Sequence, residues 1–112
     1  MKKAIRLNPI PPAYYFNHLG VAYRVSGQYE EAITAYKKAI HNQPTLLFAH
    51  LGLAASYIYV GQEEEAHAEA AEVLKIDPEF SLERYAKTKT YPSKNKADTD
   101  RYVGALRKAG LK

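Results

Sequence analysis

Apolar side chains recur with helical spacing through the middle of the chain. Along the first such segment they fall at i, i+3, i+4 and i+7, which is one face of an α-helix. These positions are Phe16, Leu19, Gly20 and Tyr23. The pattern stops at Gly27, since glycine takes the left-handed conformation of a helix end at little cost. The segment therefore predicts one helix that ends before this glycine.

A second helical pattern follows at once. Glu30 and Glu31 open it, where negative charge meets the positive end of the helix dipole. Its apolar face has the spacing i, i+4, i+7 and i+8 and consists of Ala32, Tyr36, Ala39 and Ile40. Pro44 ends the pattern, because proline cannot continue a helix. Together the two segments predict an antiparallel pair of helices joined by a tight turn.

The same plan recurs 34 residues later. Sliding the chain along itself by that distance brings eight identical residues into register without a gap. The matches are Leu19 with Leu53, Tyr23 with Tyr57, Gly27-Gln28 with Gly61-Gln62, Glu30-Glu31-Ala32 with Glu64-Glu65-Ala66, and Pro44 with Pro78. We therefore predict two helix pairs, over residues 13–46 and 47–80. They should stack, because one pair cannot bury its apolar face alone.

The flanking segments break the pattern. Residues 1–9 copy the spacing with which the first pair ends and are interpreted as the tail of a preceding helix. Residues 81–112 are predicted to form a helical cap over the exposed end of the second pair. Within this cap we expect a short helix over 80–86, a basic loop over 91–96 and a helix that Asp98 caps.

The end of that last helix is marked in the sequence. We expect it to run to about Ala109 and to stop at Gly110, a glycine suited to the left-handed position. Leu111 should then fold back on Leu106, a contact that often accompanies such an end.

The spacing of these landmarks resembles the tetratricopeptide repeat (TPR) family. The matching residues of the first pair are Phe16, Leu19-Gly20, Tyr23, Ala32, Tyr36, Ala39 and Pro44. The second pair is a looser match, with His50, Ala54, Ala70 and Val73 at the variant positions. The resemblance implies an all-α fold: an α-solenoid of antiparallel helix pairs with a C-terminal capping helix. It also implies a non-catalytic scaffold that binds a protein or peptide.

In this family the first helix of each pair lines a concave groove. The corresponding protein-binding positions here are Tyr14, Asn17, His18, Val21, Arg24 and Val25, then Phe48, Leu51, Gly52, Ala55, Ile58 and Tyr59. The second group is largely apolar, so it either binds an apolar segment or is covered by the chain's own C-terminal helix. One subtype binds acidic C-terminal tails through Lys and Asn side chains. Only Asn17 corresponds, so a carboxylate clamp of that kind is not expected.

A narrower resemblance joins the entry and the end of the chain. The residues that carry it are Asn8–Tyr15, Leu19–Tyr23, Phe80–Tyr85, Asp100-Arg101-Tyr102 and Ala105–Leu111. They resemble the C-terminal end of bacterial proteins that fuse TPRs to class III adenylate/guanylate cyclase or winged-helix regulatory domains. This implies a longer signalling or regulatory parent, with any cyclase activity upstream. A structural or oligomerisation role within that parent is the alternative to ligand binding.

Charge is distributed unevenly along the chain. The net charge is +4, but residues 1–80 carry 7 Lys and Arg against 9 acidic residues, and residues 81–112 carry 9 against 3. The basic residues Lys87, Lys89, Lys94 and Lys96 are interleaved with Tyr85 and Tyr91. A nucleic-acid-contacting surface over residues 84–112 is therefore one hypothesis, but a solvated loop and helix are favoured because no nucleic-acid motif accompanies the charge.

Composition limits the remaining chemistry. The chain has no cysteine, which favours a reducing cytoplasm, and no apolar run of the roughly 20 residues that a membrane span needs. The four histidines never pair at helical spacing, so no metal site is expected. Glu63-Glu64-Glu65 opens a helix and is explained by the dipole. We expect no catalytic residue and no cofactor, and we regard self-association as a possible property.

Overall fold

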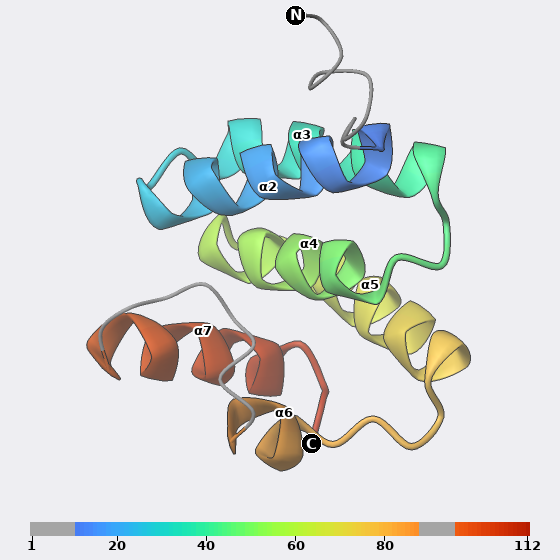
Figure 1. Cartoon of the computed structure of the whole chain (residues 1–112). Helices are drawn as coiled ribbons and strands as arrows, with labels where there is room; N and C mark the ends of the chain where they lie inside the picture. Colours follow the sequence, from blue (N-terminus) through green and yellow to red (C-terminus); the bar gives the residue numbers. More distant parts are fainter. Residues whose placement is uncertain (1–10, 88–95) are drawn as a thin grey trace, which may run out of the picture.

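The computed structural model describes residues 11–87 and 96–112, and within these residues it contains helices and no strand (Figure 1). The helices are α2 (Pro12–Val25), α3 (Tyr29–Asn42), α4 (Leu47–Tyr59), α5 (Glu63–Ile76), α6 (Leu82–Lys87) and α7 (Lys96–Lys108). The predicted all-α fold of consecutive helix pairs is confirmed. The expected tail helix over residues 1–9, and residues 91–95 of the loop expected over 91–96, lie outside the described residues, whereas Lys96 begins α7.

The two helix pairs turn in the same way. Gly27 and Gly61 have φ angles of 87° and 84°, in the left-handed region that favours glycine. In each turn the residue after the glycine donates its backbone N–H to a carbonyl at the end of the preceding helix. Gln28 bonds to Tyr23 and Gln62 to Tyr57, both at 2.8 Å. These bonds satisfy carbonyls that the helix end leaves free, so the repeated glycine fixes both hairpins.

Helix α4 is the centre of the molecule. It packs against α2, α3, α5 and α7, and its residues from Ala49 to Tyr57 are buried without a break. Tyr36 of α3 is fully buried where the pairs meet, with its ring against the backbone of Gly20 and Gly52. A Cβ atom on Gly20 would lie 2.6 Å from the Tyr36 ring, so the helices approach this closely only because glycine stands there.

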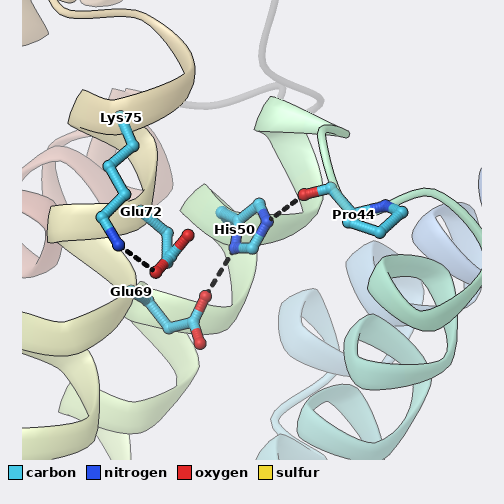
Figure 2. Close-up of polar contacts among 5 residues, drawn as sticks. All are labelled: Pro44, His50, Glu69, Glu72 and Lys75. Atoms are coloured by element: carbon cyan, nitrogen blue, oxygen red, sulfur yellow. Dashed lines mark hydrogen bonds and ion pairs between the residues drawn. The ribbon is translucent and has the colours of Figure 1, made fainter.

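A buried histidine joins the loop between the pairs to α5 (Figure 2). The His50 ring contacts the Glu69 carboxylate through Nδ1 at 2.6 Å and the Pro44 carbonyl through Nε2 at 2.7 Å. Both partners accept hydrogen bonds, so the doubly protonated imidazolium satisfies both. Burial lowers the pKa of His50, but the bonds to Glu69 and Pro44 and the nearby carboxylates outweigh it, and the pKa lies above 6.5.

The C-terminal cap packs on α4, and α7 lies on the side of α4 away from α2 and α3 (Figure 1). Leu106 and Leu111 are buried, and the N–H of Leu111 bonds to the Leu106 carbonyl at 3.1 Å after Gly110 turns the chain with a φ of 114°. The expected fold-back at the end of the last helix is therefore confirmed. The N–H of Leu82 bonds to the Lys112 carbonyl at 2.7 Å, which ties α6 to the chain end.

Two boundaries of the cap differ from the prediction. Helix α6 begins at Leu82 and α7 at Lys96, so the last helix starts before Asp98, which lies inside it. Helix ends are set by local fraying and tertiary contacts that a capping residue alone does not determine. The side chains of residues 86–99 lie outside the described ones, so the hypothesis of a basic nucleic-acid surface stays a prediction.

An arginine and two tyrosines fasten the start of α7 to both helix pairs. Arg101 donates a hydrogen bond of 2.6 Å to the Tyr29 hydroxyl and lies over the Tyr59 ring, 4.4 Å from its centre. The two tyrosine rings are themselves 4.8 Å apart. No helix of the described residues is long and apolar enough to cross a membrane.

Candidate functional site: a cavity between the first helix pair and the cap

A cavity of about 230 Å³ lies where α2 faces the folded-back cap. Its walls are formed by Tyr14, Asn17, His18, Val21 and Arg24 of α2, Tyr36 of α3, Phe48 of α4, Tyr85 of α6 and Tyr102 of α7. The α2 residues recur at helical spacing and share one face. The cavity therefore joins the first pair, the start of the second pair and the cap in one site.

A buried cation lies in the wall of this cavity. Arg24 is 7% exposed, donates from Nε to the Tyr36 hydroxyl at 3.2 Å and lies over the Tyr102 ring, 4.0 Å from its centre. Burial by itself lowers the pKa of Arg24, but Tyr102 and Tyr36 raise it above its ordinary range, so the guanidinium is charged. Among the described residues no carboxylate pairs with it.

The tyrosines around Arg24 stay neutral at physiological pH. Burial raises the pKa of Tyr36 to about 12, although the Arg24 charge lowers it. Burial also raises the pKa of Tyr102, helped by its hydrogen bond with Tyr85. The hydroxyls therefore remain protonated, and they do not neutralise the guanidinium.

One polar atom in the wall has no partner. Asn17 Oδ1 is buried and makes no hydrogen bond, the only such side-chain atom among the described residues. An unpaired buried acceptor costs about 1–3 kcal/mol. A ligand that brings an N–H or O–H group to this atom would recover that free energy.

The mouth of the cavity is aromatic. Tyr14 and Phe48 are 41% and 45% exposed, on α2 and α4 respectively. The Phe48 ring lies 6.3 Å from that of Tyr85, and Tyr85 lies 5.8 Å from Phe80. Exposed aromatic side chains beside a buried charge form a surface that binds groups with both apolar and polar parts.

Comparison with known proteins bears on the fold. Residues 13–46 match the family model described as the tetratricopeptide repeat. The fold is a TPR solenoid. Among solved structures the chain is similar to the second TPR of Spaghetti (RPAP3) bound to the HSP90 peptide SRMEEVD, with a TM-score of 0.61 and 20% sequence identity. The match covers 88% of this chain and 82% of that one. At this identity the likeness shows the fold alone. Among curated proteins, no sequence matches the chain.

Six of the twelve expected groove residues line the cavity of this TPR fold: Tyr14, Asn17, His18, Val21, Arg24 and Phe48. The other six do not, and of these Val25 is 49% exposed outside the cavity. Leu51 and Ala55 of α4 are fully buried, and Gly52 is buried against Tyr36. Ile58 and Tyr59 are half-buried away from the cavity, and Arg101 covers the Tyr59 ring.

For the second helix pair, burial favours coverage by the chain's own C-terminal helix over an apolar segment of a partner. Leu51 and Ala55 have no exposed surface, and α7, which packs on the same helix, has an apolar face of its own that includes Leu106. The role of these α4 residues as groove positions stays a prediction.

Three residues of the site are missed by sequence reasoning. Tyr36 is recognised only as part of an apolar helix face, and Tyr85 and Tyr102 only as residues of the C-terminal cap. Their place in the wall depends on α6 and α7 returning to α2, which no local pattern signals. The one sequence signal for such a position is a tyrosine expected in the core, because its buried hydroxyl needs a hydrogen-bond partner nearby.

Within the described residues, the histidines do not gather into a cluster that could bind a metal ion. His18, His41 and His67 are exposed, and His50 is occupied by its two hydrogen bonds. Within residues 11–87 and 96–112, no three His, Cys, Asp or Glu side chains gather closely enough to hold a metal ion.

Proposed function

We propose that the chain is a non-catalytic protein-interaction module that binds a short segment of a partner protein in the cavity between α2, α4 and the cap. The observation that carries the proposal is the cavity itself, where a buried arginine without a carboxylate partner among the described residues and a buried amide oxygen without a hydrogen bond lie behind exposed aromatic rings. The TPR fold supports it, because such folds are interaction modules.

The chemistry of the wall favours an acidic segment. Arg24 and His18 are the basic groups of the lining, and none of the lining residues, all from the described part of the chain, carries a carboxylate. A carboxylate that reaches Arg24 would pair a charge that is otherwise buried alone. The peptide in the similar RPAP3 structure is also acidic, although a clamp built from lysines is not present in this wall.

The size of the cavity limits how large a part of a ligand it can hold. Its volume of about 230 Å³ lies below the roughly 300–1,000 Å³ of pockets that enclose a drug-sized ligand. The site therefore fits one or two side chains of a peptide that lies across the surface. We propose an acidic side chain beside Arg24, a backbone N–H at Asn17 and an apolar side chain between Tyr14 and Phe48.

A panel of labelled seven-residue peptides tests this function. The peptides share an apolar residue and differ only in one position, which is Glu, Gln or Lys. We expect the Glu peptide to bind the chain most tightly by fluorescence anisotropy, and Phe48→Ala or Tyr14→Ala to weaken it about tenfold or more without a change in helicity. Both side chains are exposed, so their removal leaves the core intact.

Tyr15→Ala is the matched control. Tyr15 neighbours Tyr14 in sequence and is 50% exposed, but it does not line the cavity. Binding should therefore be unchanged in this variant. Equal losses in Tyr14→Ala and Tyr15→Ala, or equal affinity for the Glu, Gln and Lys peptides, would contradict the proposed site and its chemistry.

The parent of the module is a further part of the proposal. The likeness of Asp100-Arg101-Tyr102 and Ala105–Leu111 to the ends of bacterial cyclase-type and winged-helix regulatory proteins supports a signalling or regulatory parent. The absence of cysteine supports a cytoplasmic location. The sequence of the full gene product tests the first point, and a parent without a signalling domain would contradict it.

A further inference from the structure

The outer face of the first helix pair is open and partly apolar. Two adjoining hollows of about 340 and 470 Å³ lie along α2 and α3 on this side, and they share Phe16, Thr34 and Lys38. The first hollow also contains Leu19 and Tyr23. This surface, here called the outer face, is separate from the aromatic cavity, with which it shares no residue.

The 34-residue repeat shows that the α2 side of the outer face is built like a buried interface. Its α2 residues and the neighbouring Tyr15 and Ala22 have equivalents in α4, and the pairs are Tyr15 with Ala49, Phe16 with His50, Leu19 with Leu53, Ala22 with Ser56 and Tyr23 with Tyr57. All five α4 residues are buried. All five α2 residues are half-buried or exposed, Tyr15 to 50%. Within residues 11–87 and 96–112, the surface that is covered on α4 is therefore left uncovered on α2.

The charges that cross this face are arranged symmetrically. Glu30 and Glu31 lie four and three residues before Thr34, and Lys37 and Lys38 lie three and four residues after it. These spacings place all five side chains on one side of α3, with the two charge pairs about one helical turn from Thr34 in opposite directions. All five are exposed, and no ion pair joins the four charged groups to another described residue.

We propose that the outer face binds a second copy of this chain across a two-fold axis near Thr34. In that arrangement the α3 helices run antiparallel, so the glutamates of each copy meet the lysines of the other. A two-fold interface requires a surface that is complementary to itself, and a charge pattern that inverts about its centre has this property. Thr34 and Ala35, both small, lie at the centre, where the helices approach most closely.

Apolar contact and charge have different roles in this interface. Exposed ion pairs add little affinity, so the attraction comes from covering Phe16, Leu19 and Tyr23. The charges fix the alignment, because a shifted or parallel arrangement places like charges together. The proposed dimer does not depend on the peptide site, because no residue of the outer face lines the cavity.

Charge reversal tests the alignment. Sedimentation of the full chain should show a concentration-dependent dimer. The acidic variant, Lys37→Glu with Lys38→Glu, and the basic variant, Glu30→Lys with Glu31→Lys, should each raise the dimer dissociation constant about tenfold or more. A mixture of the two variants should recover dimers, and so should the fourfold variant that combines all the changes, because both restore opposite charges across the axis.

The repeat supplies a matched control. Glu64→Lys with Glu65→Lys changes the equivalent positions of α5. This variant also loses two negative charges that favour the start of a helix, but it should leave the dimer intact. Circular dichroism of every variant checks that the helices persist. If the basic variant and this control weaken association equally, the charges act on folding and the alignment is wrong.

A cross-link provides a second measurement. The chain has no cysteine, so Thr34→Cys introduces a single thiol beside the proposed axis. Mild oxidation should link the two copies, since only close residues meet the distance that a disulfide needs. Ala68→Cys, at the equivalent and exposed position of α5, should link far more slowly.

Three results would overturn the proposal. The first is a chain that stays monomeric in sedimentation at all concentrations, which would favour a preceding helix pair of a longer parent as the partner of the outer face. The second is a fourfold variant that does not recover the dimer. The third is equal cross-linking of Thr34→Cys and Ala68→Cys.

Discussion

Single residues decide how closely the helices of this chain approach. Tyr36 is fully buried, its ring lies on two glycines and its hydroxyl accepts a bond from Arg24. It therefore touches both helix pairs and the wall of the cavity. The sequence pattern identifies Tyr36 as a core residue, but not as the one that joins packing to the candidate site.

A methyl group at Gly20 should separate the helices. The added Cβ atom would lie 2.6 Å from the Tyr36 ring, and this ring is held on its other sides by burial and by Arg24. We expect Gly20→Ala to lower the free energy of unfolding by about 1–3 kcal/mol in urea titrations. Gly104→Ala is the control: Gly104 lies inside α7 facing open space, so alanine there should stabilise the helix by about 0.5–1 kcal/mol. Equal stabilities of the two variants would contradict the Tyr36 contact.

The protonation of His50 should make stability depend on pH. Its pKa is raised in the folded chain above the ordinary 6.5, so the folded state holds the proton more tightly than the unfolded state. The resulting stabilisation is complete below about pH 6.5 and is lost as the pH rises through the folded pKa. The free energy of unfolding should therefore fall over this range, which chemical denaturation at a series of pH values measures.

Two variants isolate this effect. Glu69→Gln removes the charge beside Nδ1 and should bring the pKa of His50 down, as seen in an NMR titration of the ring. His50→Gln should flatten the pH dependence, although it also disturbs the bond to the Pro44 carbonyl. A slope that persists unchanged in His50→Gln would assign the effect to another group.

At the scale of elements, α7 packs on the second helix pair. Leu51 and Ala55 of α4 are fully buried, and the start of α7 is held by the contacts of Arg101 and Tyr102 with the repeats. Six of the expected groove residues line the cavity beside α2 instead. The cap contributes Tyr85 and Tyr102 to the wall of this candidate site.

Truncating Leu106 should show how much the packing of α7 contributes to the stability of the chain. Leu106 is fully buried, so Leu106→Ala should lower the free energy of unfolding by about 2–5 kcal/mol in urea titrations. Leu74→Ala removes the same atoms from a side chain of α5 that is 41% exposed, and should cost about 0.5 kcal/mol. Similar losses in both variants would mean that α7 is not packed on α4 in solution.

For the whole molecule, the order of local stability follows from how many elements surround each helix. Helix α4 packs against α2, α3, α5 and α7, whereas α2 has an open outer face. Buried elements open only with global unfolding, and exposed ones open locally. The chain should therefore be most stable at its middle rather than equally stable along the solenoid.

Amide hydrogen exchange measures this order directly. We expect the slowest exchange in α4 between Leu51 and Ser56, and faster exchange in the first turns of α2. Dimerisation through the outer face should slow the exchange of α2 and α3 as the protein concentration rises. Amides of α2 that outlast those of α4 in dilute solution would contradict the central position of α4.

The sequence by itself determined the helix pairs. Their periodicity, the glycines at 27 and 61 and the glutamates at each second helix are local signals, and helices and turns respond to local signals because their hydrogen bonds join near neighbours. Six residues of the cavity, five on α2 and Phe48 on α4, were also named through the resemblance to TPRs.

Only the tertiary structure decided what the cap covers. The contact between Arg101 and Tyr29 joins residues 72 positions apart, and Arg24 meets Tyr102 across a similar separation. Such contacts depend on which apolar surfaces pack together after the helices have formed, and several arrangements of the helices are compatible with the same local pattern. This is why the burial of Leu51 and Ala55, and the enclosure of Arg24 by Tyr36 and Tyr102, could not be derived from spacing alone.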